Sequence, residues 1–536
     1  MPRETPAGVS AGWRRWIPRD PYTIAAWLVF ISIVVCCWVG FVDADEEIYL
    51  LGSRRLADPS LLATDLTWMK LSPTTALYDH LLAPLWSFLD AFAIVNLGRF
   101  AFWALMAWSL AQLAKAIRLP AWSLVVGFTF WLLWKQTLGT CGSPFQGFQP
   151  KSFAYPLVIM SLTSVLRGNT GRAGLAAGLA TAFHIVVGGW ACLAICLGLL
   201  VERSLFTFRQ VAIYLGAAAL FIAPLLIALF LFRTGHVAAG EQARMNEIYT
   251  LFAMPHCCDP SYFMASSHIP LAWLRSTLVF ALSLLAVFAW PDRRVAVILG
   301  SFIAALIAFF GLGLMARQFG MYGLLTLYPF QLANALPALF LFVFAAAWLS
   351  APGIARTRRW LVAAPLLAGT LWLGYDGDVA RSLIDQPQSF INELQSVGIV
   401  SPTLTELDPL YAWIRANTPR SSVFITPMIY EFWPYAERAQ VASMRQPPLD
   451  ESIVEWERRL VDLNGRKPYV KRGFETQVEL AQNERSLSIA ELTQLRDHDG
   501  ATHYLVQGER KDLTAHLLHA EQGYFIYDLT HMSASE

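Results

Sequence analysis

Charged residues are scarce in this sequence. Asp, Glu, Lys and Arg make up only 15% of the 536 residues, whereas 56% are hydrophobic. Soluble domains carry about a quarter charged residues, so the chain as a whole is not a soluble globular protein. The formal net charge is +1 and no basic stripe with interleaved aromatic residues is present, which excludes a nucleic-acid-binding protein.

Common metal and nucleotide motifs are also missing. The seven cysteines form no C-x-x-C pair and no Cys/His spacing typical of zinc. Residues 380–536 contain no cysteine, no glycine-rich phosphate loop and no G-x-S-x-G turn. Cys141, Cys257 and Cys258 fall in predicted loops, so Cys141 pairs with one of the other two only if both loops face an oxidising compartment.

Long hydrophobic runs, in contrast, dominate residues 22–375 and predict about eleven membrane helices. The runs lie at 22–42, 90–114, 121–136, 152–166, 173–183, 185–201, 211–232, 270–290, 295–316, 330–350 and 360–375. The run at 173–183 covers only about half a bilayer at 1.5 Å per residue, which favours a re-entrant or tilted helix. The expected fold class is a mainly α, polytopic membrane helical bundle.

The loops between these runs predict the orientation in the membrane. Alternate loops carry clusters of arginine and lysine, and such clusters mark the cytoplasmic side. The clusters are Arg14/Arg15/Arg19, Lys115/Arg118, Arg167/Arg172, Arg203/Arg209, Arg293/Arg294 and Arg356/Arg358/Arg359. With a retained first helix and eleven spans, the N-terminus is cytoplasmic and the C-terminal part extracytoplasmic. Arg54, Arg55 and Lys70 on the other side are exceptions.

Two domains are expected. Residues 1–379 form the membrane domain, with a first outer loop at 43–89, and residues 380–536 form a small extracytoplasmic α/β domain. In the second domain SSVFITP, ATHYLVQ and GYFIYDLT read as strands, and a helix is expected around 511–519. Nothing in it indicates catalysis, so a scaffolding, acceptor-binding or lid role is favoured.

The first outer loop opens with an unusual concentration of negative charge. The stretch GFVDADEEIYL places Asp43, Asp45, Glu46 and Glu47 directly after the first apolar run. Such acids often only end an outward-going helix in water. Here an amphipathic segment, LLGSRRLADPSLLATDLTWMK, follows them and suits a helix on the membrane surface. A carboxylate held at the lipid–water boundary is partly desolvated and can act as a base near neutral pH.

These residues carry a resemblance. DEEIY resembles the Asp-Glu-x-x-Tyr element in the first outer loop of GT-C fold glycosyltransferases, notably lipid A aminoarabinose transferases and bacterial relatives of protein O-mannosyltransferases. FQPKSFAY (148–155) and GLATAFH (178–184) resemble elements that recur in uncharacterised bacterial GT-C-like membrane proteins. The resemblance covers about 350 residues in architecture and about 20 in motifs.

By this resemblance Asp45 is the general base that deprotonates an acceptor hydroxyl, which attacks a sugar carried on a polyprenyl phosphate with inversion. Asp43 is the alternative base, and Glu46 or Asp43 orients the acceptor. Tyr49 completes the motif as a substrate contact, and Asp65 is a further candidate. No cofactor is expected; a divalent metal at Asp43 and Asp45 is the less favoured alternative.

Other candidates would bind the donor phosphate or the acceptor. Lys151 starts a helix at the outer boundary, where a lysine also snorkels to headgroups. Arg99 and Arg275 lie inside apolar runs and Arg317 at the end of one, where charge is costly. His184 is a phosphate contact or proton relay, or merely a helix–helix hydrogen bonder. His256 is expected in the acceptor cleft.

The leading hypothesis is therefore a membrane glycosyltransferase of the bacterial inner membrane. Its partners are a polyprenyl-phosphate sugar, an extracytoplasmic glycan, lipid or protein acceptor, and the bilayer. A transporter or flippase of a lipid-linked or anionic substrate is the second reading, although no internal repeat supports it. A non-catalytic GT-C-like scaffold is the third.

Overall fold

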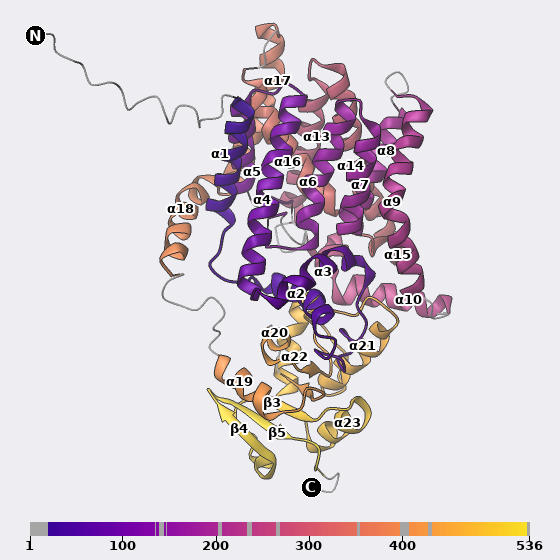
Figure 1. Ribbon diagram of the computed structural model, residues 1–536, viewed down its shortest axis with the longest axis vertical. Coiled ribbons are helices and arrows are strands. Elements are labelled where there is room, and N and C mark those ends of the chain that lie inside the picture. Colours follow the sequence, from indigo (N-terminus) through magenta and orange to yellow (C-terminus); the bar gives the residue numbers. More distant parts are fainter. Residues whose placement is uncertain are drawn as a thin grey trace, which may run out of the picture.

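The computed structural model describes residues 20–134, 136–138, 144–145, 147–201, 206–232, 238–263, 269–350, 354–396, 407–426 and 431–532. A bundle of long helices forms one end of the molecule, and a small part with a β-sheet forms the other (Figure 1). The chain is thus a polytopic membrane helical bundle with a C-terminal α/β part, as the sequence predicts.

Each of the apolar runs is helical. The helices are α1 (Pro21–Cys37), α4 (Ala91–Ala116), α5 (Ala121–Leu133), α6 (Pro150–Leu166), α7 (Thr170–Phe183), α8 (Ile185–Val201), α9 (Phe208–Phe232), α13 (Ile269–Phe288), α14 (Arg293–Gln318), α16 (Gln331–Trp348) and α17 (Arg356–Asp376). Among the described helices, 5 are long and apolar enough to cross a membrane. The number of crossings stays a prediction.

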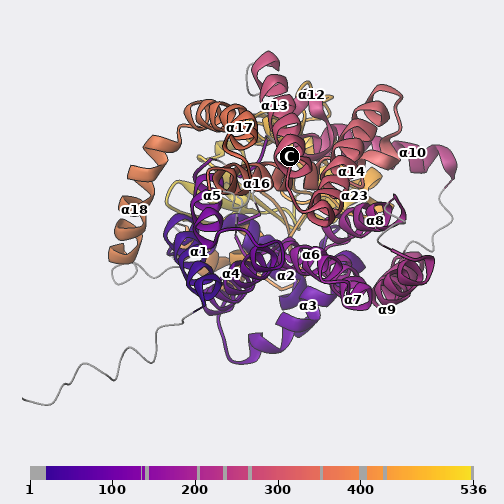
Figure 2. The ribbon, with the colours of Figure 1, turned by 90° about the horizontal axis from the view of Figure 1, so that it is seen from above.

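Helices α16 and α9 mark the inside and the outside of the bundle. In α16, 94% of the most apolar window is buried, so this helix is packed on all sides. In α9 only 6% of that window is buried, and α9 lies at the edge of the bundle (Figure 2). A helix that is apolar all round and exposed faces lipid.

The short helix α7 is held against α9 by close backbone contact. A Cβ at Gly174 would lie 2.1 Å from the Tyr214 carbonyl oxygen, and one at Gly178 would lie 2.5 Å from that of Ala218. Glycine is the residue that permits this approach. With 14 residues, α7 is about 21 Å long, which confirms that it is too short to span a bilayer upright.

Basic residues of several loops meet at the end of the bundle away from the sheet. Lys115 pairs with Asp20 at 3.1 Å, Arg167 donates to the Gln112 side chain at 2.8 Å, and Arg294 donates to the Val165 carbonyl at 3.1 Å. These contacts join three of the predicted clusters, which confirms that they share one end.

The first outer segment, residues 43–89, lies between the bundle and the C-terminal part (Figure 1). It contains α2 (Ala44–Ala57), η3 (Pro73–Thr75), α3 (Ala76–Leu82) and η4 (Ala83–Ser87). The remaining described helices outside the sheet part are the short α10 (Ala239–Glu247), η5 (Ile248–Ala253), α11 (Pro255–Cys258), α12 (Pro260–Phe263) and α15 (Tyr322–Leu325), and the longer α18 (Val379–Ser396). Helix α18 packs beside α1, where the rings of Phe390 and Trp38 meet edge to face.

The C-terminal part contains a five-stranded sheet with the order β2-β1-β3-β5-β4, of which β2-β1-β3 is parallel and β3-β5-β4 antiparallel. Its strands are β1 (Val423–Ile425), β2 (Ala439–Gln440), β3 (His503–Gln507), β4 (Leu517–Glu521) and β5 (Tyr524–Asp528). Its helices are α19 (Asp408–Asn417), α20 (Phe432–Ala436), α21 (Ser452–Leu463), η6 (Gly473–Glu475), α22 (Thr476–Glu484), α23 (Ile489–Asp499) and η7 (Lys511–His516).

One element differs from expectation. The helix predicted around 511–519 ends at His516, and residues 517–521 form strand β4. Gln522 and Gly523 both have positive φ, at 50° and 80°, and join β4 to β5 in a tight hairpin. Two consecutive positive φ values match the twist of paired strands, so the turn at Gln522–Gly523 selects a hairpin over a longer helix.

The C-terminal part docks on the first outer segment through several ion pairs. Arg54 binds Glu437, Lys70 binds Glu451 at 2.7 Å, and Arg420 binds Asp58 at 2.8 Å. Salt bridges at exposed positions add little free energy each. Their spread along the segment nevertheless fixes the orientation of one part on the other.

Candidate active site

Helix α2 starts inside the acidic stretch, and its N-terminus is built as a capping box. Asp43 is the N-cap and its Oδ1 accepts from the Asp45 backbone N–H at 2.9 Å. The Glu46 carboxylate in turn accepts from the Asp43 N–H at 2.8 Å. Acidic side chains also suit the positive end of the helix dipole. The sequence DADE therefore sets where α2 begins.

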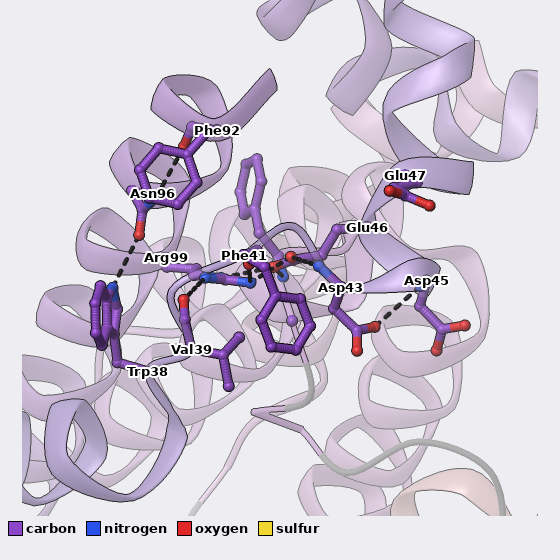
Figure 3. Close-up of polar contacts among 12 residues, drawn as sticks. Trp38, Val39, Phe41, Asp43, Asp45, Glu46, Glu47, Phe92, Asn96 and Arg99 are labelled. Carbon is purple, nitrogen blue, oxygen red and sulfur yellow. Dashed lines mark hydrogen bonds and ion pairs between the residues drawn. The ribbon is translucent and has the colours of Figure 1, made fainter. Parts of the chain in front are cut away.

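Glu46 is fixed in place by an ion pair with Arg99 of α4 (Figure 3). Neither side chain exceeds 1% exposure. Arg99 Nε and Nη2 donate to the two Glu46 oxygens at 2.8 and 2.5 Å, and its remaining N–H groups donate to the carbonyls of Val39 and Phe41. Both predicted candidates thus bind each other, and four of the five Arg99 N–H donors are used in these contacts.

Glu46 also binds the loop that precedes α6. The Phe148 backbone N–H donates to Glu46 Oε1 at 2.5 Å. Gly147, with a φ of 74°, makes this approach possible, because a Cβ there would lie 2.8 Å from Glu46 Cγ. The first outer segment, α4 and the start of α6 therefore meet at one carboxylate.

Asp45 points away from this buried ion pair (Figure 3). Its side chain is 47% exposed, so it is open to a substrate. One oxygen accepts from the Gln149 side chain at 3.4 Å, and the other lies 3.8 Å from Arg445 Nη2. Arg445 belongs to the C-terminal part and is a contact that sequence reasoning missed.

Lys151 and His256 lie within electrostatic range of Asp45, and His184 lies within electrostatic range of Lys151. The Lys151 side chain is buried at the start of α6 and interacts electrostatically with Asp45, Asp43 and His184. The His256 ring lies against Phe474 with 4.2 Å between centroids and interacts electrostatically with Asp45. Burial lowers the pKa of His256 to about 4, so this imidazole is neutral at pH 7. The structure thus brings together side chains from four distant segments.

A cavity of about 590 Å³ adjoins this group of side chains. Tyr49, one helical turn after Asp45 on the same face of α2, is among its lining residues, as is His184. Burial, with the Asp45 charge adding to it, raises the pKa of Tyr49 to about 12, so the phenol keeps its proton. In His184 the ring Nδ1 accepts from the Val187 N–H at 3.1 Å, which leaves Nε2 as the donor of the neutral ring.

Asp65 and Glu47 lie in the contact with the C-terminal part. Asp65 accepts from the Trp433 indole at 2.8 Å and from the Gln440 N–H at 2.9 Å. Glu47 accepts from the Tyr435 hydroxyl at 2.7 Å. Both carboxylates therefore help to hold the C-terminal part on the first outer segment.

Arg275 and Arg317 lie on other elements and are paired. Arg275 Nε donates to Asp376 of α17 at 2.6 Å. Arg317 donates to Asp259 at 3.0 Å, and Asp259 also accepts from Arg472 at 2.6 Å. The two arginines join helices to each other and to the C-terminal part, and neither contacts Asp45.

The other sequence candidates concern metal and sulfur. Among the residues that the structure describes, no group of three or more His, Cys, Asp or Glu side chains is arranged to hold a metal ion. Cys257 is disulfide-bonded, whereas Cys258 is free and buried. Cys141 lies outside the described residues.

Comparison with solved structures identifies the fold. The archaeal oligosaccharyltransferase AglB from Archaeoglobus fulgidus, in complex with an inhibitory peptide and a dolichol-phosphate, is similar over 93% of this chain and 70% of its own, at 10% identity and a TM-score of 0.50. The membrane bundle has the GT-C fold. ArnT from Cupriavidus metallidurans is similar over 97% of this chain and 98% of its own, at 13% identity and a TM-score of 0.41.

Sequence comparisons add one local match to the GT-C fold. The family described as "Domain of unknown function (DUF6798)" matches residues 405–463. No curated protein matches the chain significantly in sequence. The matched residues include Trp433, Tyr435, Gln440 and Arg445, which are those that contact the acidic stretch and Asp65.

The Glu46–Arg99 pair predicts a large loss of stability on substitution. Arg99→Met leaves the Glu46 carboxylate buried without its cation, which we expect to cost about 3–5 kcal/mol. The midpoint of thermal unfolding in detergent measures this loss of stability. Lys115→Met removes the exposed pair with Asp20 and should barely change the midpoint. Equal shifts for the two variants would contradict a structural role for Arg99.

The docking carboxylates predict a pH dependence. Burial raises the pKa of Glu47 to about 7 and that of Asp65 to about 6. The folded protein therefore holds more protons than the unfolded chain between pH 4 and 7, and its stability should fall as pH rises through that window. Limited proteolysis at pH 5.5 and 8 measures the loosening of the C-terminal part.

In Glu47→Gln, which keeps an acceptor for Tyr435, the difference between the two pH values should shrink. Glu451→Gln, at an exposed ion pair of the same contact, is the control and should leave it unchanged. Greater protection at pH 8 than at pH 5.5 would show the assignment to be wrong.

Proposed function

We propose that this protein is a membrane glycosyltransferase that moves a sugar from a polyprenyl-phosphate carrier to an acceptor hydroxyl. The observation that carries the proposal is the half-exposed carboxylate of Asp45 on the first outer segment of a GT-C bundle, 3.8 Å from Arg445 and within electrostatic range of Lys151. AglB was solved with a dolichol-phosphate, itself a polyprenyl phosphate, which supports this class of donor.

In this mechanism Asp45 accepts the proton of the acceptor hydroxyl. The freed oxygen forms a bond to the anomeric carbon from the face opposite the phosphate, while the carbon–oxygen bond to the phosphate breaks. The electron pair leaves with the phosphate, so the anomeric configuration inverts through an oxocarbenium-like state. Asp43 orients Asp45 through the cap hydrogen bond to the Asp45 backbone.

The departing phosphate gains negative charge, and two cations lie beside Asp45 to stabilise it. Lys151 is buried, and its ammonium is held near Asp43 and Asp45 by electrostatic attraction. Arg445 Nη2 lies 3.8 Å from the Asp45 carboxylate. Donors fixed in advance at developing charge are a large source of catalysis. In this proposal Lys151 and Arg445 supply the positive charge that a divalent cation at Asp43 and Asp45 would otherwise supply, and no metal is needed.

The same proposal includes the location of the protein and its orientation in the membrane. Three of the basic clusters share the end of the bundle away from Asp45, which supports an N-terminus in the cytoplasm and a C-terminal part outside a bacterial inner membrane. Residues 1–379 then act as the membrane domain and 380–536 as an extracytoplasmic domain that completes the site. The acceptor is an extracytoplasmic glycan, lipid or protein.

The pairing in the bundle disfavours the transporter reading. That reading used Arg99, Arg275 and His184 as a substrate path. Arg99 is bound to Glu46 and Arg275 to Asp376, so a passing anion would have to break two charge pairs. If the protein were a non-catalytic scaffold, the placement of the exposed Asp45 near Arg445 and Lys151 would have no explanation.

Asp45→Asn should abolish transfer while leaving the fold intact. Asparagine has the same shape but is not a base, and loss of general-base catalysis costs about 10²–10⁴-fold in rate. The assay is mass spectrometry of envelope glycans and lipids from a deletion strain complemented with each variant. A product lacking one sugar should accumulate together with the polyprenyl-phosphate donor.

Two matched variants make this test selective. Asp58→Asn alters another exposed carboxylate of the first outer segment, paired with Arg420, and should complement fully. Asp43→Asn keeps a cap acceptor and should retain part of the activity. If Asp45→Asn complements as well as wild type, Asp45 is not the base and the glycosyltransferase proposal loses its main support.

Arg445→Met should lower kcat by about 10²-fold, the usual effect of removing one donor at developing charge. Arg445→Lys should restore part of the rate, since it keeps the positive charge. EDTA should leave the wild-type rate unchanged. Kinetics on purified protein measure all three. Normal kcat in Arg445→Met, or a loss of rate with EDTA that Mg²⁺ restores, would contradict the assigned roles.

A further inference from the structure

The cavity beside Asp45 is lined by several distant parts of the chain. It lies between the first outer segment, the C-terminal end of α9 and residues 446–453 of the C-terminal part, with contributions from residues 184–186, 242–254 and 326–328. Its volume of about 590 Å³ is that of a small-molecule site. Asp45, Lys151 and Arg445 are not among its lining residues.

One wall of the cavity is apolar and belongs to a helix at the edge of the bundle. Leu226, Leu229, Phe230 and Phe232 of α9 line it. Phe230 is 76% exposed, and only 6% of the apolar window of α9 is buried. Since such a helix faces lipid, the cavity borders the hydrocarbon layer on this side. An occupant with a hydrocarbon chain can enter along α9.

The cavity surface is mostly apolar, but its lining also carries a set of uncharged polar side chains. Hydroxyl and amide groups come from Ser72, Thr74, Thr75, Gln242, Asn246 and Gln446. Among the described lining residues Lys70 is the one lysine and none is an arginine, and Lys70 is already paired with Asp450 at 3.3 Å and with Glu451 at 2.7 Å. A phosphate group here would find no uncompensated lysine or arginine.

Asp79 provides an unmet hydrogen-bond acceptor in this lining. It is 3% exposed and its Oδ2 accepts from the Thr75 hydroxyl at 2.6 Å, whereas Oδ1 has no hydrogen-bond partner among the described residues. Gly52 makes room for it, since a Cβ there would lie 2.6 Å from Oδ1. Burial raises the pKa of Asp79 to about 7, so the carboxyl is partly protonated at neutral pH and can donate as well as accept.

We propose that this cavity binds an amphipathic acceptor: a lipid with an uncharged, hydroxyl-rich headgroup held by Asp79 and the surrounding hydroxyls. This inference rests on the proposed glycosyltransferase function. Tyr49 and His184 line the cavity and lie within electrostatic range of Asp45 and Lys151, so a headgroup hydroxyl at that end reaches Asp45. The donor phosphate binds next to the cavity, at Lys151 and Arg445.

The test is a binding measurement that does not depend on transfer. The whole protein is placed in phosphatidylcholine nanodiscs, and two radiolabelled probes are titrated: geranylgeranyl β-glucoside, which is neutral, and geranylgeranyl phosphate, which is anionic. Leu229→Trp fills the cavity from the lipid side, and Asp79→Leu removes both hydrogen-bonding oxygens. Each should weaken glucoside binding about tenfold or more, the effect of losing one good hydrogen bond or the space for the ligand.

Matched controls separate the cavity from the rest of the protein. Leu220→Trp places the same side chain on the same helix, at a residue that is 67% exposed and does not line the cavity, and should bind the glucoside as wild type does. Phosphate binding should be unchanged in Leu229→Trp and Asp79→Leu.

Three results would overturn the inference. These are equal glucoside binding in Leu229→Trp and wild type, loss of phosphate binding in Leu229→Trp, or no glucoside binding by the wild type. Glucoside binding that depends on Leu229 but accompanies full transfer by Asp45→Asn would keep the lipid site and remove the catalytic proposal. Failure of either idea is therefore recognised separately.

Discussion

The ion pair between Glu46 and Arg99 is the constraint on which the rest of the site depends. It is fully buried, and Glu46 also accepts from the backbone N–H groups of Asp43 and Phe148. A buried carboxylate is tolerated only when donors surround it, so these four contacts must form together. They fix the start of α2 and the start of α6 to α4, and thereby bring Asp45 and Lys151 to the same place.

This constraint explains the charge at the end of the first apolar run. The four acidic side chains point in different directions around α2 and have different roles. Asp43 caps the helix, Glu46 faces the bundle, and Glu47 faces Tyr435 of the C-terminal part. Asp45 is left on the open side, half exposed and beside Arg445. Asp43, Glu46 and Glu47 thus hold Asp45 in position. A helix end that is only solvated would not need this set of contacts.

The fold was predictable from the sequence because hydropathy over long runs records which segments avoid water. All the apolar runs are helices, and the strands around Phe424, Tyr504 and Ile526 were expected. The site was predictable only in part. Lys151 and His256 do come within electrostatic range of Asp45, but Arg445 lies 400 positions from Asp45 and no spacing rule links them. The partners of Arg99 and Arg275 lie 53 and 101 positions away, so a charge in an apolar run indicated importance without showing that its role is pairing.

The arrangement also explains why the C-terminal part is joined to the helical bundle. The segment that matches a family of unknown function, 405–463, supplies every described contact from the C-terminal part to Glu47, Asp65 and Asp45. Glu47 and Asp65 are buried where they meet it, so undocking would expose both carboxyls to water and at the same time remove Arg445 from Asp45. Docking and assembly of the charged site are therefore one event, and the bundle alone holds the carboxylate without one of its two cations.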